Sequence, residues 1–209
     1  MIVEALGAVA VAYFLGGIPF GYLIGRSQGL DIREHGSGNI GATNVVRVLG
    51  KKLGYSCFLL DFGKGLAPVL VAAKVFSDSS QSGWPPALVA LATVCGHVFS
   101  PYLKLRGGKG VATATGALLG VAPIPLLCAV ACWVGLYLLT RTVAVASIAA
   151  AVSLPIFALL GNATQFSRTA PTAMSLLVLI AAMIVIRHRS NIQRMLAGAE
   201  HSFSERDPK

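Results

Sequence analysis

The sequence is short of charged residues, and acidic residues are the scarcer kind. Only 12% of its 209 residues are charged, with 8 Asp and Glu against 17 Lys and Arg, whereas 55% are hydrophobic and the mean hydropathy is +0.73. Soluble globular domains typically contain about 25% charged residues. The composition therefore excludes an ordinary soluble domain and predicts an integral membrane protein.

The sequence also lacks the cysteine and histidine patterns of disulfide-bonded and metal-binding proteins. All four cysteines lie in apolar stretches, no C-x-x-C pair is present, and no histidine stands at the spacing of a metal ligand. We interpret the cysteines as packing residues, and we expect no metal and no cofactor. The net charge of +9 does not predict nucleic-acid binding, because basic cytoplasmic loops that face anionic phospholipid explain it.

Long apolar runs, bounded by glycine, proline and charged residues, take up most of the chain. Glu4 is the only charge before Arg26, so the first run lacks the basic region of a cleaved signal peptide and is expected to be a retained span. Residues 110–140 are too many for one span of about 20 residues and too few for two full ones, so two short helices are predicted to meet at Pro123 and Pro125. The predicted spans are 3–25, 53–76, 85–99, 111–121, 125–139, 143–160 and 171–186.

The predicted fold is an all-α polytopic membrane protein with seven transmembrane helices, some of them short. Residues 1–209 are expected to form one domain, in which the polar residues 201–209 are a flexible tail. An N-terminus outside and a C-terminus in the cytoplasm place most Lys and Arg residues in inner loops, as the positive-inside rule requires.

The loop after the first span reads HGSGNIGATN, residues 35–44, and its glycines formally match a dinucleotide-binding fingerprint. That fingerprint has meaning between a strand and a helix of a soluble parallel sheet, whereas this one joins two membrane spans, so we exclude it. Closely spaced glycines can instead present backbone N–H groups as an anion-binding nest. A polar interfacial turn without a ligand explains the same residues. The polar side chains beside the glycines are Ser37, Asn39, Thr43 and Asn44.

A second candidate site lies in GHVFSPYLKLRGGKGVAT, residues 96–113. Its sequence GGKG, residues 107–110, precedes a predicted helix, so backbone N–H groups, a helix N-terminus and the Lys109 ammonium can converge on an anion. It is not a Walker A loop, because Leu103 and Gly110 stand where that motif needs Gly and Ser or Thr. The alternative is topological, since any inner loop collects positive charge.

A third cluster, RHRSNIQRMLAGAE at 187–200, follows the last span. His188 and Asn191 are three residues apart and share a helical face, from which both can hydrogen-bond a phosphate or a hydroxyl. Glu200 is expected to cap or pair structurally. In the predicted topology all three clusters face the cytoplasm, which favours a single phosphate-binding site on that side.

Two charges lie inside the second predicted span. Asp61 and Lys64 share one helical face, about 12 Å from the inner end. Charges at that depth must pair with each other or line a polar cavity, and they often mark function. A purely structural ion pair explains them equally well.

Five segments taken together closely resemble the acyl-phosphate-dependent glycerol-3-phosphate acyltransferases, the PlsY family. They are GSGNIGATNVVRVLG, LLDFGKGLAPV, GHVFSPYLKLRGGKGVAT, RTVAVASI and RHRSNIQRMLAGAE, in family order from residue 36 to residue 200. The resemblance implies a multi-pass enzyme of the bacterial inner membrane, active at the cytoplasmic face. It would transfer a fatty acyl group from long-chain acyl-phosphate to the 1-hydroxyl of sn-glycerol 3-phosphate, giving lysophosphatidic acid and phosphate, the first step of phospholipid synthesis.

The resemblance also implies roles for individual residues. The glycerol phosphate would be held by Ser37, Arg47, Lys109, Ser147, His188 and Asn191, of which Ser37, Arg47, Lys109 and His188 are the expected catalytic residues. The second phosphate and the acyl carbonyl would be placed by Asn39, Thr43 and the backbone amides of Gly107, Gly108 and Gly110. Asn44, which stands beside them in the first loop, is also expected to bind substrate.

The chemistry of an acyl-phosphate fits these residue types. The donor is a mixed anhydride with a good leaving group, so we expect no covalent intermediate, and the enzyme has only to align an alcohol with a carbonyl and offset negative charge. No histidine is followed by Asp five positions later, so the His-x-x-x-x-Asp pair of other glycerophosphate acyltransferases is missing. In the family view the substrate's own phosphate, whose second pKa is about 6, accepts the hydroxyl proton.

Two other functional classes are weighed against this one. A small anion transporter would favour two repeated halves with a site at the membrane midplane, and the sequence shows no repeat. A CDP-alcohol phosphotransferase needs several aspartates to bind metal, yet Asp61 is the only acidic residue within any predicted span after Glu4.

Overall fold

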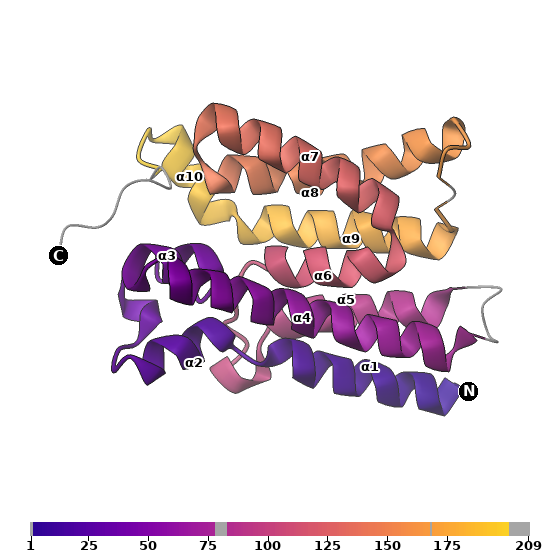
Figure 1. Ribbon diagram of the computed structural model, residues 1–209, viewed down its shortest axis with the longest axis horizontal. Helices are drawn as coiled ribbons and strands as arrows, with labels where there is room; N and C mark the ends of the chain where they lie inside the picture. The colour runs from indigo at the N-terminus through magenta and orange to yellow at the C-terminus, as the bar shows by residue number, and fades with distance from the viewer. Residues whose placement is uncertain (1, 78–82, 168, 201–209) are drawn as a thin grey trace.

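The computed structural model describes residues 2–77, 83–167 and 169–200, so the tail predicted at 201–209 lies outside the described residues. All regular secondary structure in the described part is helical, which confirms the predicted all-α class. The elements are α1 (Ile2–Gly17), α2 (Phe20–Ser27), η1 (Ile32–Glu34), α3 (Ala42–Leu49), α4 (Lys51–Val75), α5 (Trp84–Val98), η3 (Pro101–Leu103), α6 (Val111–Val121), α7 (Pro123–Thr140), α8 (Val143–Ala163), α9 (Pro171–Arg187) and α10 (Arg189–Leu196) (Figure 1).

Most of the apolar helices are long enough to cross a membrane. Five stretches qualify by length and composition, and α9 with α10, bent by 53° at their junction, qualifies as a sixth. α6 has 11 residues, which rise about 17 Å against a hydrocarbon core of about 30 Å. The number of complete spans and their orientation therefore stay predictions. The five stretches are Ile2–Ser27, Lys51–Val75, Trp84–Leu103, Pro123–Thr140 and Val143–Ala163.

The proline turn predicted within residues 110–140 is confirmed. α6 ends at Val121 and α7 begins at Pro123, with Ala122 as the only residue between them. Proline is well suited to the first position of a helix, because the N–H that it lacks would have no partner within the helix there.

The first predicted span, 3–25, is not one continuous helix. α1 ends at Gly17 and α2 begins at Phe20, because Pro19 has no backbone N–H and cannot continue the helical ladder. The break leaves the carbonyl of Ile18 without a helical partner, and Lys64 Nζ donates to it at 2.6 Å. A long-range contact thus stabilises a break that the apolar pattern alone did not reveal.

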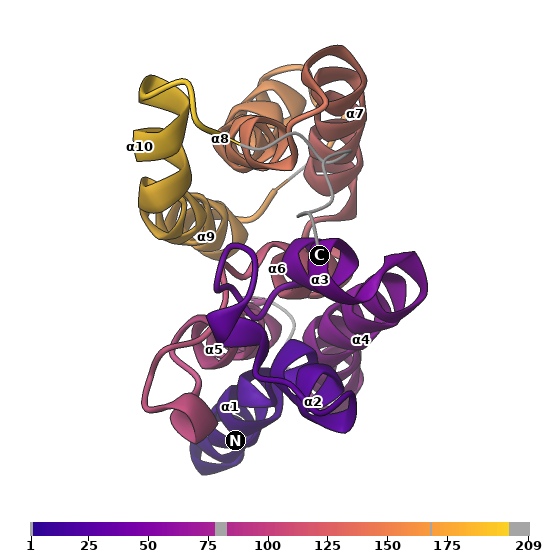
Figure 2. The ribbon, with the colours of Figure 1, turned by 90° about the vertical axis from the view of Figure 1, so that its left-hand side faces the viewer.

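Small residues bring the helices close together. A methyl group added to Gly16 of α1, Gly65 of α4 or Gly116 of α6 would lie 2.2, 2.1 and 2.0 Å from a backbone oxygen of the facing helix. Such close approach is typical of membrane helices, whose association depends on van der Waals packing. Viewed from its end, the bundle shows α7, α8 and α9 as one group, with α6 between them and α1 to α5 (Figure 2).

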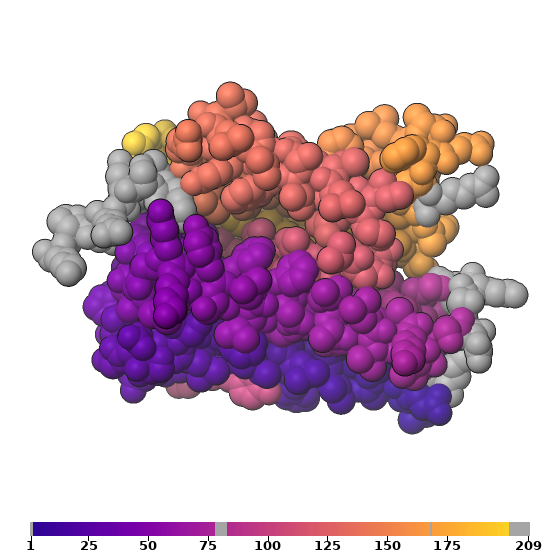
Figure 3. All heavy atoms as spheres, viewed as in Figure 1, coloured from indigo at the N-terminus to yellow at the C-terminus, as the bar shows by residue number. Residues whose placement is uncertain are grey.

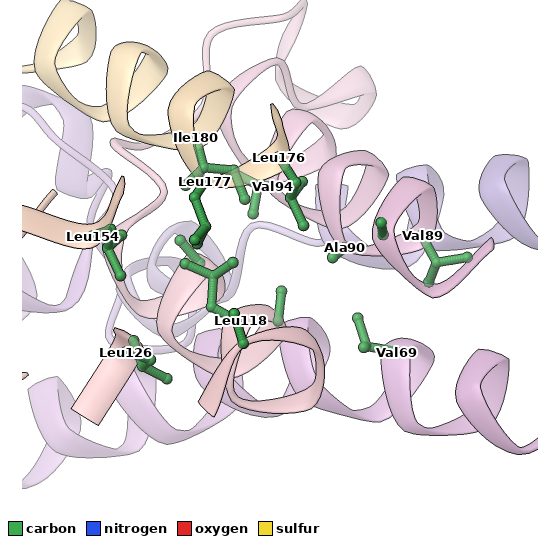
Figure 4. Packing of buried hydrophobic residues seen from close by; sticks show 14 of the residues in the cluster. Val69, Val89, Ala90, Val94, Leu118, Leu126, Leu154, Leu176, Leu177 and Ile180 are labelled. Atoms are coloured by element: carbon green, nitrogen blue, oxygen red, sulfur yellow. The ribbon is translucent and has the colours of Figure 1, made fainter. Parts of the chain in front are cut away.

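Buried aliphatic side chains join these two groups of helices. Leu118 of α6 and Leu177 and Ile180 of α9 are all completely buried where α6 meets α9 (Figure 4). This dense packing gives the glycine loop that precedes α6 a rigid support.

The three polar clusters lie at one end of the bundle. α2, α3 and α10 are at the left in Figure 1, whereas the N-terminus is at the opposite end. Hydrogen bonds from Lys109 to Asn191 and from Arg187 to Gly107 join the second and third clusters directly. The fold therefore brings the three clusters together on one side of the protein, as predicted.

Candidate active site

A cavity of about 630 Å³ lies where the three clusters meet. A space-filling view shows a hollow between the surface of α4 and that of α7 (Figure 3). Every predicted site residue lines this cavity except two glycines, Gly107 and Gly108. Its polar end contains Ser37, Asn39, Thr43, Asn44, Arg47, Lys109, Gly110, Ser147, His188 and Asn191.

Most of the rest of the cavity wall is apolar, and the exceptions are Asp61, His97, Thr115, Arg194 and Glu200. Most of its apolar side chains come from α4, α6, α7 and α8, and they form a continuous surface with the polar end. Such a surface suits an alkyl chain, because burying each CH₂ group contributes about 0.8 kcal/mol. Sequence reasoning did not single out these residues, since lining an apolar cavity and facing lipid require the same residue types. They include Tyr55, Phe58, Leu118, Leu126, Trp133 and Leu154.

Asn44 shapes the first loop from inside. Its side chain is buried, its Nδ2 donates to the carbonyls of Ile32, His35 and Asn39 at 2.9 to 3.2 Å, and its Oδ1 accepts from the amide of Ser37 at 2.8 Å. Both amide N–H groups are thus used within the loop. The structure thus gives Asn44 a positioning role within the loop, and its expected contact with substrate stays a prediction.

Tight loop geometry brings the free polar groups to the cavity. Gly36 has φ +58°, and a methyl group there would lie 2.4 Å from Asn44 Oδ1, so glycine is required for the turn. The side chains of Ser37, Thr43 and Arg47 make no hydrogen bond to any other described residue and face the cavity. They are available to a ligand.

The resemblance implies that the backbone amides of the glycine loop, residues 107–110, are free to bind a ligand. The structure shows that two of them already have partners. The amide of Gly107 donates to the carbonyl of Val98, and that of Gly108 to the carbonyl of His97, each at 3.1 Å. These two amides are occupied in anchoring the loop to the end of α5, and neither glycine lines the cavity. Gly110, with φ +84°, starts α6 and does line the cavity.

Lys109 projects from this loop into the polar end. Its Nζ donates to Asn191 Oδ1 at 2.5 Å, and Asn191 Nδ2 in turn donates to Glu200 Oε1 at 2.6 Å. Glu200 also pairs with Arg194, with 2.9 Å between Nε and Oε2, as expected of a structural carboxylate. Burial lowers the pKa of Lys109 to about 8, and the nearby arginines, among them Arg47, act in the same direction.

Two further side chains present hydrogen-bonding groups to the cavity. Trp133 Nε1 donates to Ser147 Oγ at 3.1 Å, which leaves the hydroxyl hydrogen of Ser147 free to be donated to an anion. His188 Nδ1 lies 2.8 Å from the carbonyl of Ile184 and therefore carries its hydrogen, so Nε2 of the neutral ring is an acceptor. The part played by Trp133 was not predicted, because nothing in its local sequence connects it with Ser147.

The charges inside α4 form a buried ion pair. Lys64 Nζ lies 2.8 Å from Asp61 Oδ1, and the two side chains are 4% and 2% exposed. His97 Nδ1 lies 3.7 Å from the same oxygen, and Asp61 and His97 both reach the cavity wall. Both expectations for charges at this depth are thus met, since the two side chains pair with each other and Asp61 borders the cavity.

We expect Asp61→Asn to destabilise the protein by about 3 to 5 kcal/mol, because it leaves the Lys64 ammonium buried without its counter-ion. Thermal unfolding in detergent measures the effect as a lower midpoint. The double variant Asp61→Asn with Lys64→Met should lose less than Asp61→Asn alone. The exposed Lys74 of the same helix is the control, and Lys74→Met should leave the midpoint unchanged. An unchanged midpoint for Asp61→Asn would contradict the assignment.

The fold and the cavity together define a class: a multi-helix membrane protein in which one cavity has a cationic, polar end and a long apolar wall. A family model described as glycerol-3-phosphate acyltransferase matches residues 6–198. The chain belongs to this family and is an integral membrane acyltransferase.

Individual relatives are similar in sequence to this chain along almost its whole length. The glycerol-3-phosphate acyltransferase of Aquifex aeolicus is 42% identical over 200 residues, which cover 96% of this chain and 100% of the relative. That of Geobacter sulfurreducens is 44% identical over 195 residues, covering 93% and 95%.

Solved structures give the same result in three dimensions. The crystal structure of PlsY (YgiH), an integral membrane glycerol 3-phosphate acyltransferase, in its glycerol 3-phosphate form has a TM-score of 0.88 at 42% identity and covers 96% of each chain. The lysophosphatidic acid form has a TM-score of 0.84 at 41% identity and covers 95% of each chain.

Proposed function

We propose that the protein transfers a fatty acyl group from acyl-phosphate to the 1-hydroxyl of sn-glycerol 3-phosphate, giving lysophosphatidic acid and inorganic phosphate. The observation that carries the proposal is the continuity of the cavity. Cations and hydroxyls from three distant segments lie at one end, and an apolar wall extends from them between α4 and α7. The solved relatives in glycerol 3-phosphate and lysophosphatidic acid forms support the same substrate and product here.

The polar end is suited to two anionic reactants. Arg47 and Lys109 supply positive charge, while Ser37 and Ser147 supply hydroxyl donors. Arginine binds phosphate through a planar fork and lysine as a point charge, so the two cations complement each other. We assign the glycerol phosphate to these four groups together with His188 and Asn191, and the second phosphate to the side of Asn39 and Thr43.

The transfer itself is a direct displacement. The 1-hydroxyl oxygen attacks the acyl carbon, a new ester bond forms, and the bond between the acyl carbon and the phosphate oxygen breaks, so that phosphate departs with the electron pair. Acyl-phosphate is a mixed anhydride with a good leaving group, so the transfer needs no covalent intermediate. The main tasks of the protein are then alignment and charge stabilisation.

The proton of the attacking hydroxyl goes to a phosphate oxygen of the substrate in this proposal. His188 Nε2 is an acceptor and can orient a hydroxyl of the glycerol, which makes His188 a binding residue. The phosphate dianion, with a second pKa of about 6, is basic enough to take the proton as the bond forms.

We place the enzyme in the inner membrane of a bacterium, with the active site on the cytoplasmic side and no cofactor required. Basic residues gather in the loops at the site end of the bundle, which supports a cytoplasmic orientation by the positive-inside rule. The alkyl chain of the donor would enter from the lipid, while the glycerol phosphate would enter from water.

A comparison of two donors tests the proposal. Detergent-purified protein is given glycerol 3-phosphate with either palmitoyl-phosphate or palmitoyl-CoA, and lysophosphatidic acid and phosphate are quantified. We expect equimolar lysophosphatidic acid and phosphate from palmitoyl-phosphate, and no product from palmitoyl-CoA. Equal or faster turnover of palmitoyl-CoA would overturn the choice of donor. Activity that persists in excess EDTA and without a transmembrane gradient separates this enzyme from a metal-dependent phosphotransferase and from a transporter.

The pKa of Lys109 predicts a pH dependence. As the pH rises through about 8 the Lys109 ammonium loses its proton and stops attracting phosphate, so the KM for glycerol 3-phosphate should rise several-fold between about pH 7.5 and about pH 9.5. The Arg47 guanidinium also lines the polar end and sets a limit to the rise. Lys109→Arg retains the charge and should flatten the alkaline limb of the profile. Identical alkaline profiles for the two proteins would show that another group is responsible.

A further inference from the structure

The glycine loop has no side chain of its own to hold it, apart from Lys109. Residues 107, 108 and 110 are glycines, which are the most flexible residues in the unfolded chain. On the side of α5, the amides of Gly107 and Gly108 donate to the carbonyls of Val98 and His97. These bonds leave the carbonyls of the two glycines to be held by another element.

That second anchor comes from α9. The guanidinium of Arg187 donates from Nη2 to the carbonyl of Gly107 at 2.9 Å and from Nε to the carbonyl of Gly108 at 3.2 Å. Two bonds from one planar group fix the orientation as well as the position of the peptide units that they reach. Arg187 is half-buried and lies outside the cavity that Lys109 lines, although it borders a second, smaller cavity with Gly107, Ser37 and Asn39.

The place of Arg187 in the chain connects the two halves of the site. It is the last residue of α9 and directly precedes His188, while the loop that it anchors carries Lys109. α9 lies alongside α6 in Figure 1, so the end of α9 meets the start of α6. Lys109 then reaches across to Asn191 of α10, and the loop and the helix end are thereby joined at two points.

We propose that Arg187 is a positioning residue for the glycine loop, which it holds so that the Lys109 ammonium faces His188 and Asn191 across the polar end of the cavity. Arg187 thus acts through Lys109 and not by touching substrate. The inference rests on the proposed function only in taking glycerol 3-phosphate as the anion that Lys109 binds.

The hydrogen bonds that Arg187 already makes favour this role over direct phosphate binding. Both Nε and one terminal nitrogen of Arg187 are already used by backbone carbonyls. Lysine has a single nitrogen at the end of a flexible stem and cannot reproduce this fork. An Arg187→Lys variant should therefore recover only part of the function, although it keeps the charge.

The test compares Arg187→Gln and Arg187→Lys with Arg189→Gln, whose arginine is exposed two residues further on. Binding of glycerol 3-phosphate to the detergent-purified protein is measured by calorimetry, and thermal unfolding is recorded in parallel. We expect Arg187→Gln to weaken binding by about 10- to 100-fold, Arg187→Lys to fall in between, and Arg189→Gln to match the wild type. Wild-type binding by Arg187→Gln would overturn the proposal.

A double-mutant cycle shows whether Arg187 acts through Lys109. In a Lys109→Met background, Arg187→Gln should add less than a threefold further loss, because the loop no longer carries the ammonium that Arg187 positions. Fully additive losses would mean that Arg187 contacts the anion itself, and the positioning role would be rejected.

The reactivity of Lys109 gives a readout that needs no ligand. An amine-selective reagent, followed by mass spectrometry of the peptide that contains Lys109, should label this lysine several-fold faster in Arg187→Gln than in Arg189→Gln. Equal rates would contradict the anchoring role even if the proposed acyl donor proved wrong. If palmitoyl-phosphate proves not to be a donor while the Arg187 variants bind and label as expected, the proposed acyl donor is rejected and the role of Arg187 stands. Should Arg187→Gln fail to fold, the same labelling comparison on Arg187→Lys decides the question.

Discussion

Lys109→Met is expected to lower kcat/KM for glycerol 3-phosphate by about 10³-fold, equivalent to about 4 kcal/mol of transition-state stabilisation. Methionine keeps most of the side-chain volume, so the change removes the ammonium and its hydrogen bond to Asn191 Oδ1 while preserving the packing. Arg47 remains as a cation in the cavity, but it approaches from α3 and cannot replace a group delivered by the glycine loop. Steady-state kinetics over a range of glycerol 3-phosphate concentrations measures the loss.

Lys104 supplies the matched control for this experiment. It is an exposed lysine five residues earlier in the same connection, outside the cavity. Lys104→Gln should stay within about twofold of the wild type, because it changes the net charge without touching the site. Equal losses in the two variants would show that general charge near the membrane, and not the placed ammonium, accounts for the effect.

Gly107→Ala is expected to lower activity by about 10²-fold, an effect within the range of about 1 to 3 kcal/mol that overpacking produces. The added methyl group would lie 1.9 Å from the backbone oxygen of His97 and 2.8 Å from that of Val98. Neither backbone atom can turn aside, so the loop must move away from α5 and carry Lys109 with it. The assay is kcat/KM for glycerol 3-phosphate, with thermal unfolding as a check on the fold.

Two other glycines show whether the loss is local. At Gly108 the nearest obstacle is His97 Nε2 at 2.3 Å, a side-chain atom that can shift, so Gly108→Ala should lose less than Gly107→Ala. Gly135 of α7 has no atom within 4 Å of the added methyl group, and Gly135→Ala should be neutral or slightly stabilising. A neutral Gly107→Ala would mean that the loop is not held against α5 as described.

Much of the architecture could be predicted because membrane helices follow from local composition. A run of about 20 apolar residues specifies a span almost independently of the rest of the chain. The predicted helices at 111–121 and 143–160 therefore begin at the residues at which α6 and α8 begin. The turn at Pro123 was also predictable, because proline acts through its own backbone.

The break of the first span was missed for a related reason. Pro19 was visible in the sequence, but prolines inside membrane helices are often tolerated, as Pro68 in α4 and Pro155 in α8 are here. What distinguishes Pro19 is the Lys64 ammonium, which bonds the Ile18 carbonyl from 46 residues away. No local pattern contains that contact.

The polar residues of the site were predicted as a set, but several of their individual tasks were not. Residue type and spacing indicate which groups can bind phosphate, whereas the hydrogen bonds already made within the protein decide which remain available. The Asn44 side chain is hydrogen-bonded within its own loop, and the amides of Gly107 and Gly108 donate to carbonyls at the end of α5. Arg187 and Trp133 acquire their tasks only through partners distant in the chain.

The sequence alone determined the membrane environment, the approximate helices and the three segments rich in glycine, cations and hydroxyls, because each of these depends on residues that are close neighbours in the chain. The tertiary structure alone decided at which end of the bundle those segments meet, which backbone amides are free to bind a ligand, and how the Lys109 side chain is oriented. These outcomes depend on contacts between residues that are tens of positions apart, and such contacts exist only after the helices have packed.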